Sequence, residues 1–200
     1  MTHPSRAFAW AHDAELRAFV ATRAFAQISI AIDGRPVAAH APLAIGADGS
    51  IRFHLARANR LTAHLDGAPA LATVVGDDAY ISPDWYGTED QVPTWNYRLV
   101  EIEGIARRLG EADLIDQLDR LSAAQEALLA PKPAWTMAKL SPARNGALLK
   151  GIVGFAIDAP LLRGVAKLGQ NKSASERAGV EAALTALGRH DVARAMAAGA

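Results

Sequence analysis

Residues 25–55 read FAQISIAIDGRPVAAHAPLAIGADGSIRFHL, and this stretch decides the fold. Apolar residues occupy every second position from 26 to 32, which is the period of a half-buried β-strand. The pair Asp33-Gly34 follows directly and is typical of a tight hairpin turn. A returning strand is expected over 37–45 and, after a second turn, a third strand over 51–55. The stretch therefore predicts an antiparallel meander of three strands.

The segments outside the meander alternate between strand and helix patterns. Strands are predicted over 71–75, 79–81, 95–109, 152–157 and 161–168, and 82–93 is predicted to be a loop. Helices are predicted to start at Asp13, to cover 58–65 and 112–129, and to run from 173 to the end with a break at Gly188. Short strands interspersed with helices are typical of the α+β class, so we predict a mostly antiparallel barrel of about six or seven strands.

The domain organisation predicted from the sequence is simple. The chain shows no internal repeat and no low-complexity linker, so residues 1–200 are predicted to form a single domain. The barrel is expected over about 24–168 and a C-terminal helical segment over about 173–198.

Composition excludes several classes of protein. With no cysteine in 200 residues, the chain has no disulfide scaffold, no catalytic thiol, no iron–sulfur cluster and no Cys-based zinc site. The 21 Lys and Arg residues equal the 21 Asp and Glu residues, so no net charge attracts nucleic acid or membrane. No apolar run approaches the ~18–20 residues of a membrane span, and no secretory core follows the N-terminus. We therefore expect a soluble, cytoplasmic protein.

Aromatic residues with a polar group gather in one part of the chain. Five of the seven Trp and Tyr residues lie between positions 80 and 97: Tyr80, Trp85, Tyr86, Trp95 and Tyr97. Such side chains concentrate where one end is buried and the other meets a ligand or a partner. A plug of the core beneath a long loop is an equally good interpretation of this cluster taken alone.

Two polar segments follow predicted strands and are rich in hydrogen-bond donors. Residues 54–60 read HLARANR, and residues 167–172 read KLGQNK. Cationic side chains and exposed N–H groups at the end of a strand suit a phosphate. Taken alone, each segment is better explained as an ordinary solvated turn.

The remaining motifs give little support for other chemistry. The six histidines form no HExxH and no short metal-binding spacing, so we predict no metal site. His40 and His54 lie on adjacent predicted strands and could face one another, although a histidine satisfied within the barrel is the simpler interpretation. No dinucleotide-binding glycine motif, Walker loop or Gly-x-Ser-x-Gly elbow is present.

Together these segments resemble one family, the PaiB-like FMN-binding proteins, which are described as negative transcriptional regulators. The stretches that carry the resemblance are HAPL at 40–43, HLARAN at 54–59, AYISPDWY at 79–86, VPTWNY at 92–97, KGIVGF at 150–155 and KLGQN at 167–171. They occur in the order of the family and span most of the chain. One departure is Gly169, which stands where the family usually has serine; its missing hydroxyl would weaken FMN binding if that group contacts the cofactor.

The resemblance implies a split β-barrel like that of pyridoxamine-phosphate oxidase, assembled as a homodimer with FMN in a cleft between the two chains. It implies that the phosphate and ribityl chain of FMN contact Arg57, Asn59, Lys167, Gln170 and Asn171. By the same resemblance, Trp95, Asn96 and Tyr97 contact the isoalloxazine, and His40 and His54 line the cleft. Trp85 and Tyr86 are candidates for the dimer interface.

Three functions remain open at this point. The first is an FMN-binding repressor; the chain has no helix-turn-helix pattern, and residues 163–194 carry six Lys and Arg against three Asp and Glu, so DNA as a partner is implied by the resemblance alone. The second is an FMN-dependent oxidoreductase, in which the flavin supplies the chemistry and no catalytic residue can be named. The third is a flavin or haem carrier, with His40 or His54 as an iron ligand.

Overall fold

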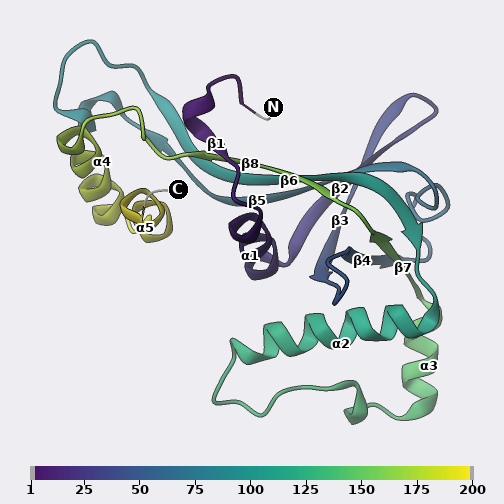
Figure 1. Ribbon diagram of the computed structural model, residues 1–200. Coiled ribbons are helices and arrows are strands. Elements are labelled where there is room, and N and C mark those ends of the chain that lie inside the picture. The colour runs from purple at the N-terminus through teal and green to yellow at the C-terminus, as the bar shows by residue number, and fades with distance from the viewer. Residues whose placement is uncertain (1–2, 199–200) are drawn as a thin grey trace. The chain divides into compact units, whose positions relative to one another are not determined.

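The computed structural model describes residues 3–198 and confirms the α+β class (Figure 1). One antiparallel sheet has eight strands: β1 (Ala9–Trp10), β2 (Phe25–Ile32), β3 (Arg35–Ile45), β4 (Ile51–Ala56), β5 (Pro69–Ile81), β6 (Thr94–Arg108), β7 (Ile152–Ile157) and β8 (Leu161–Lys167). The helices are α1 (Asp13–Arg23), α2 (Glu111–Ala127), α3 (Pro142–Lys150), α4 (Ala174–Ala186) and α5 (His190–Ala198), with short 3-10 turns η1 (Arg6–Phe8), η2 (Pro83–Tyr86) and η3 (Met137–Lys139). Across residues 3–198, no helix is long and apolar enough to cross a membrane.

The contacts of the chain cluster into two compact units. Unit 1 comprises Met1–Leu16, Val75–Val100 and Arg163–Ala200, and unit 2 comprises Arg17–Val74 and Glu101–Leu162. The long strands β5 and β6 contribute residues to both units, as do β8 and α1. Each unit is described by itself below, and the assignment of residues 1–200 to one domain stays a prediction.

Unit 2 contains a closed ring of six strands. The sheet order β6-β5-β2-β3-β4-β7 returns to its start because β6 also pairs with β7. The first eight residues of β3 pair with β2, and Leu43, Ala44 and Ile45 then pair with β4, so this strand passes from one partner to the next. At the closing pair, Arg108 of β6 lies opposite Phe155 of β7. This ring is the barrel predicted from the sequence.

The inside of the barrel is filled by alternate residues of its strands. On β4, Ile51, Phe53 and Leu55 are buried, and the Phe53 ring stacks on Phe155 with centroids 5.7 Å apart. The intervening residues Arg52 and His54 project from the opposite face of β4, where both contact side chains of α2. One face of β4 therefore forms core, and the other holds polar groups beneath a helix.

Unit 1 is built from the pair β1 and β8 and the two C-terminal helices. Ser173 begins α4 with a capping box, in which its hydroxyl accepts from the Glu176 N–H and the Glu176 carboxylate accepts from the Ser173 N–H. The α4 helix packs against α5 and against η2. Gly179 makes the close contact with η2 possible, since a Cβ there would lie 2.3 Å from the carbonyl oxygen of Trp85.

Most predicted elements are present, and the main differences lie in three segments. Residues 58–65 form consecutive turns instead of a helix; the Asn59 side chain accepts from the Leu61 N–H, and the Thr62 hydroxyl donates to the Ala56 carbonyl. The strands predicted over 71–75 and 79–81 are one strand, β5. The α3 helix was not predicted, although Ser141 caps it and Pro142 opens it.

Candidate functional site

Arg57 lies immediately after β4 in unit 2 and is exposed. Its Nε donates to the carbonyl oxygen of Lys150 at 2.7 Å, and its Nη2 donates to that of Ile152 at 3.2 Å. These carbonyls lie at the end of α3 and the start of β7, so Arg57 also stabilises that junction. Its remaining guanidinium N–H groups are the ones that can reach a ligand.

Asn59 is half-buried in the turns that follow. Its Oδ1 accepts from the Leu61 N–H at 3.0 Å, which leaves the amide NH₂ as the group that can donate to a ligand.

His54 is half-buried beneath α2, where its Nδ1 lies 3.0 Å from Nε2 of Gln117. Gln117 is fully buried, and its Oε1 has no hydrogen-bond partner. Burial lowers the pKa of His54 below its ordinary value of 6.5, and the hydrogen bond from Gln117 opposes this change. The ring is therefore neutral at pH 7.

The His54 pKa gives the first prediction. Because the folded chain binds this proton less readily than the unfolded chain, the His54 contribution to stability is complete above pH 6.5 and is lost as the pH falls through the lower folded value. In Gln117→Leu, which removes the opposing hydrogen bond, we expect the pKa to fall further. NMR titration of the ring in both proteins measures this, and a His54 pKa at or above 6.5 contradicts it.

His40 lies on the outer side of the barrel and is exposed. Its ring is parallel to that of Phe25, with centroids 6.1 Å apart and an interplanar angle of 13°. The β3–β4 pairing covers Leu43 to Ile45 only, so His40 and His54 are not opposite one another on the two strands. The facing pair of histidines that the sequence left open is therefore not formed on these strands.

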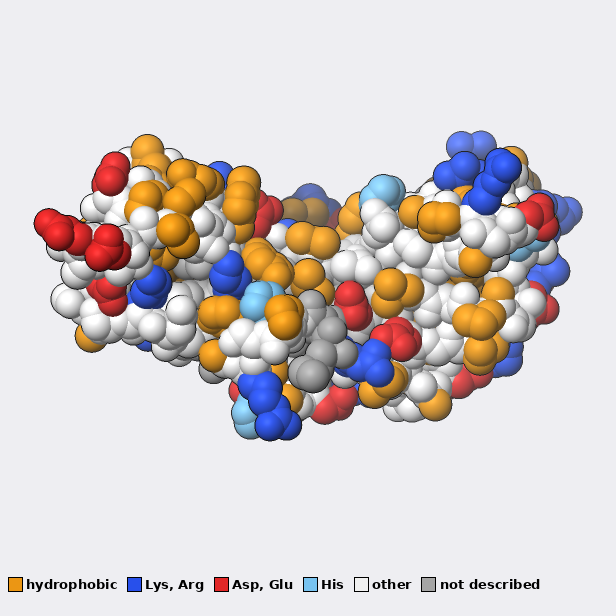
Figure 2. Space-filling model, turned by 90° about the horizontal axis from the view of Figure 1, so that it is seen from above, with side chains coloured by type: hydrophobic (Ala, Val, Ile, Leu, Met, Phe, Trp, Pro, Cys, Tyr) orange, Lys and Arg blue, Asp and Glu red, His pale blue; other side chains and the backbone are white. Residues whose placement is uncertain are grey.

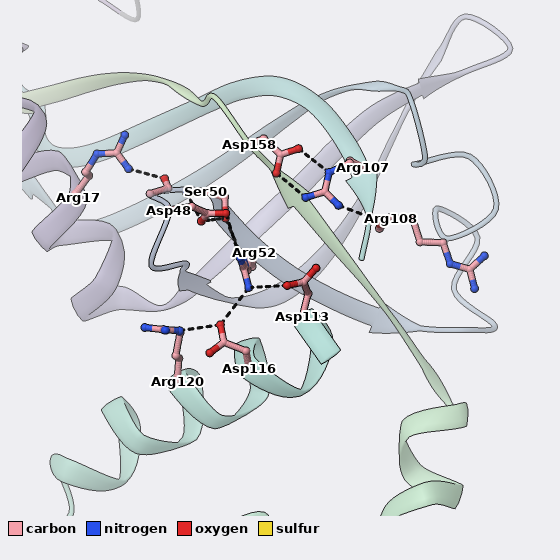
Figure 3. Close-up of polar contacts among 11 residues, drawn as sticks. Arg17, Asp48, Ser50, Arg52, Arg107, Arg108, Asp113, Asp116, Arg120 and Asp158 are labelled. Carbon is pink, nitrogen blue, oxygen red and sulfur yellow. Dashed lines mark hydrogen bonds and ion pairs between the residues drawn. The ribbon is translucent and has the colours of Figure 1, made fainter. Parts of the chain in front are cut away.

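The strongest polar cluster of unit 2 surrounds Arg52 (Figure 3). Its guanidinium lies 3.1 Å from carboxylates of Asp48 and Asp116 and 3.7 Å from Asp113, and its Nε donates to the Ser50 hydroxyl. Hydrogen bonds from Ser50, and then the charge of Arg52, lower the pKa of Asp48. Asp48 therefore contributes stability above its ordinary pKa of 3.8, and this contribution is lost as the pH falls through the folded value.

In unit 1, residues 80–97, here called the aromatic segment, present two exposed rings. Trp95 is 53% exposed and Tyr80 is 49% exposed; their ring centroids are 6.2 Å apart, edge to face. The neighbours of Trp95 along β6 differ from it. Asn96 is buried, with its Nδ2 donating to the sulfur of Met196 at 3.2 Å, and Tyr97 is half-buried. Of the three predicted isoalloxazine contacts, Trp95 is the one with an exposed ring face.

Tyr86 is buried in unit 1, and this corrects its assignment to a dimer interface. The side chain is 6% exposed, and the Lys172 ammonium lies 4.5 Å from its ring centroid. Burial raises the pKa of the Tyr86 hydroxyl, and the nearby Glu176 carboxylate adds to the effect. Its ring is therefore engaged within the unit, whereas Trp85 is only half-buried.

The 167–171 segment turns sharply after β8. Lys167 donates to the Thr94 hydroxyl, and both ends of the Gln170 amide bond to backbone of the same turn, at Leu168 and Ala166. Asn171 is exposed. Gly169 has φ of +76°, a left-handed conformation in which serine would be strained, so the glycine suits the turn as it stands here.

The predicted residues are divided between the two units. Arg57, Asn59, His40 and His54 belong to unit 2, and Trp95, Asn96, Tyr97, Lys167, Gln170 and Asn171 belong to unit 1. The sequence analysis did not single out Arg52, Gln117 or Arg108 as important. Their partners lie far along the chain, and only the regular i, i+3, i+4 spacing of Asp113, Asp116 and Gln117 on one helix face could have indicated a shared contact.

Comparison with known proteins identifies relatives along most of the chain. The family model described as "Putative FMN-binding domain" matches residues 2–159, which include every strand from β1 to β7. The chain is 32% identical over 166 residues to "Protease synthase and sporulation protein PAI 2" of Bacillus subtilis (strain 168), a match that covers 81% of this chain and 79% of that protein.

Solved structures share the fold at low sequence identity. The FAD and haem binding protein from Mycobacterium smegmatis has a TM-score of 0.58 at 19% identity, covering 85% of this chain and 78% of that one. The flavocytochrome Anf3 from Azotobacter vinelandii has a TM-score of 0.57 at 16% identity, covering 82% and 72%. These likenesses confirm the split-barrel type of fold.

Proposed function

The chain belongs to the PaiB-like family of FMN-binding proteins, and from this membership we propose that it is an FMN-binding homodimer that acts in the cytoplasm as a negative transcriptional regulator. FMN is the cofactor of the family. The family match over residues 2–159 is the observation that carries the proposal. The PaiB-like resemblance is also what supports the proposed regulation and dimerisation. The proposed location agrees with them, since a repressor must reach DNA.

The residues present fit FMN in their chemistry. The flat isoalloxazine needs apolar faces, and the exposed rings of Trp95 and Tyr80 offer them in unit 1. The ribityl chain and phosphate need N–H donors and positive charge. Asn171 and Lys167 supply such groups in unit 1, and Arg57 supplies them in unit 2. Lys167 and Arg57 keep N–H groups beyond those that bond to Thr94 and to the carbonyls of Lys150 and Ile152.

When bound, FMN would supply hydride or electron transfer, and the protein need only bind, orient and shield it. Trp95 would fix the plane of the ring. Arg57 and Asn59 of unit 2 would offer a guanidinium and a free NH₂ group to FMN, and Lys167 of unit 1 would offer its ammonium group. His54 is neutral at pH 7 and adds no charge to the site.

A flavin-dependent oxidoreductase is the second candidate, and one observation favours it. The Lys and Arg residues of segment 163–194 are engaged within unit 1: Lys167 with Thr94, Lys172 with Gln91, Arg177 with Glu181, Arg189 with the Asp78 carbonyl and Arg194 with Asp191. On the face in Figure 2, Lys and Arg (blue) appear together with Asp and Glu (red). Two of these cations, Arg177 and Arg194, are paired with carboxylates, which reduces the positive charge that segment 163–194 can offer to DNA phosphates.

The cofactor proposal predicts the effect of removing one exposed ring. We expect Trp95→Ala to weaken FMN binding about tenfold, the effect of roughly 1.4 kcal/mol of lost ring contact, without loss of fold, because the side chain is half exposed. Titration followed by flavin fluorescence and visible absorption measures this. Trp135→Ala is the matched control, since Trp135 is also exposed and lies outside the predicted site. Equal FMN affinity of Trp95→Ala and wild type would show that the isoalloxazine ring does not contact Trp95.

Two further measurements separate the candidate functions. Sedimentation at several concentrations should show a dimer. A regulator should bind its own upstream DNA with an affinity that falls steeply as salt is added. If the FMN-loaded dimer retards no such fragment but oxidises a reduced nicotinamide, the oxidoreductase is the correct assignment.

A further inference from the structure

A cavity of about 270 Å³ lies in unit 2 where the start of α2 meets the end of α3 and the strand β7. Its wall includes Arg57, Arg108 and Lys150, and the single acidic residue on it is Glu111. Three glycines also line it: Gly110, Gly146 and Gly154. A Cβ at Gly110 or Gly146 would meet nothing within 4 Å, so the wall at these points is open.

The positive charge of this cavity is not balanced within the described part of the chain. Across residues 3–198, the side chains of Arg108 and Lys150 make no ion pair and no hydrogen bond, and Arg57 bonds only to backbone carbonyls. Figure 3 shows Arg108 extending away from its neighbour Arg107, whose guanidinium is paired with Asp158. Three cations against one carboxylate leave the cavity with a net positive charge.

The backbone adds to this field at one end. The 17-residue helix α2 begins beside the cavity at Gly110, which has no side chain to cap the first N–H groups. Uncapped N–H groups and the helix dipole favour an anion there. At the other end, Arg57 donates to the carbonyl of Lys150, the last residue of α3, and to that of Ile152, the first residue of β7.

We propose that this cavity binds the phosphate group of a phosphomonoester, with Arg108 and Lys150 as its principal ligands and Arg57 behind them. The volume is below the ~300–1,000 Å³ typical of pockets that enclose a whole drug-sized ligand, so it suits one small charged group. The two charges of a phosphate are matched by the unpaired side chains of Arg108 and Lys150 and by the guanidinium of Arg57. The phosphate belongs either to FMN, in which case the inference rests on the proposed function, or to a separate phosphate ester.

The test uses the full-length protein and three ligands: inorganic phosphate, FMN and riboflavin, which lacks the phosphate. Calorimetry compares wild type with the double variant Arg108→Gln plus Lys150→Gln. The matched control is Arg107→Gln, which removes the same charge from the adjacent residue, outside the cavity. Circular dichroism checks that each variant is folded, as expected for exposed side chains.

We expect inorganic phosphate to bind wild type and to bind the double variant at least tenfold more weakly, while Arg107→Gln changes little. If the bound phosphate is that of FMN, the double variant also binds FMN more weakly, whereas its riboflavin affinity is unchanged. In wild type, inorganic phosphate then competes with FMN. If the phosphate ester is separate, FMN affinity is unchanged in the double variant. Two results overturn the inference. In the first, the double variant binds phosphate as tightly as wild type does. In the second, wild type binds no phosphate and the double substitution leaves FMN affinity unchanged. A protein that binds phosphate through these residues but never FMN refutes only the proposed function.

Discussion

Arg52→Met is expected to lower the free energy of unfolding by about 1–3 kcal/mol, because the hydrogen bonds of a buried guanidinium are lost while the three carboxylates left behind stay about half exposed to water. Arg52 is the cation that all three carboxylates share, and its side chain is only 9% exposed. Methionine fills a similar volume and does not replace the charge. Asp48, Asp113 and Asp116 would then repel one another across the contact between the barrel and α2.

The position of Arg52 explains why so much depends on one residue. Asp48 belongs to the turn between β3 and β4, whereas Asp113 and Asp116 lie on α2, so the guanidinium joins two segments more than 60 residues apart. Gly46 leaves room for this arrangement, because a Cβ there would lie within 2.6 Å of the Arg52 Nε and the Ser50 hydroxyl oxygen. The local backbone is therefore shaped around the network.

Urea unfolding at pH 7 measures the effect, and Arg120→Met is the matched control. Arg120 also bonds to Asp116, at 2.8 Å, but its side chain is 43% exposed, so its loss should cost much less than the loss of Arg52. Adding Asp113→Asn and Asp116→Asn to Arg52→Met should restore part of the lost stability, since the repulsion is removed. If Arg52→Met costs no more than Arg120→Met, the network does not hold α2 on the barrel.

The barrel was predictable because its strands repeat a local pattern. The meander of β2, β3 and β4 follows from alternation and two turns, and all three strands occur where they were expected. The error at 58–65 has a local cause. Asn59 and Thr62 bond to nearby backbone, and these side-chain bonds compete with helix formation, which apolar periodicity alone does not reveal. The α3 helix is short and exposed, and its Ser141-Pro142 start was the only cue.

The polar partners could not be predicted in the same way. Arg52 and His54 alternate with core residues, which places them on the outer face of β4, but nothing nearby shows what covers that face. Their partners come from α2, some 60 residues later. The FMN-site residues were named by family resemblance, and the structure places their backbone and exposure; their contacts with FMN stay predictions.

Gly179→Ala is expected to destabilise the protein by about 1–3 kcal/mol, although the same change in most helix interiors stabilises by about 0.5–1 kcal/mol. The reversal has a steric cause. The new Cβ would lie 2.3 Å from the Trp85 carbonyl oxygen, a backbone atom of η2, whereas real Cβ contacts below 3.0 Å are essentially unknown. Either α4 or η2 must move.

That movement would loosen the packing of the aromatic segment in unit 1. The Thr88 hydroxyl and the Gln91 amide both donate to the Glu176 carboxylate of α4, and Lys172, just before the helix, lies over the Tyr86 ring. A shift of α4 weakens these contacts together. Because Trp95 follows in the same segment, FMN affinity should fall as well if this segment holds the flavin ring.

Gly146→Ala in α3 is the matched control, since a Cβ there would meet nothing within 4 Å. We expect it to raise stability by about 0.5–1 kcal/mol, so the two glycine variants should move the unfolding midpoint in opposite directions. Thermal unfolding of both variants, with an FMN titration of the folded Gly179→Ala variant against wild type, provides the comparison. A stabilised Gly179→Ala would mean that α4 is not held against η2 in solution.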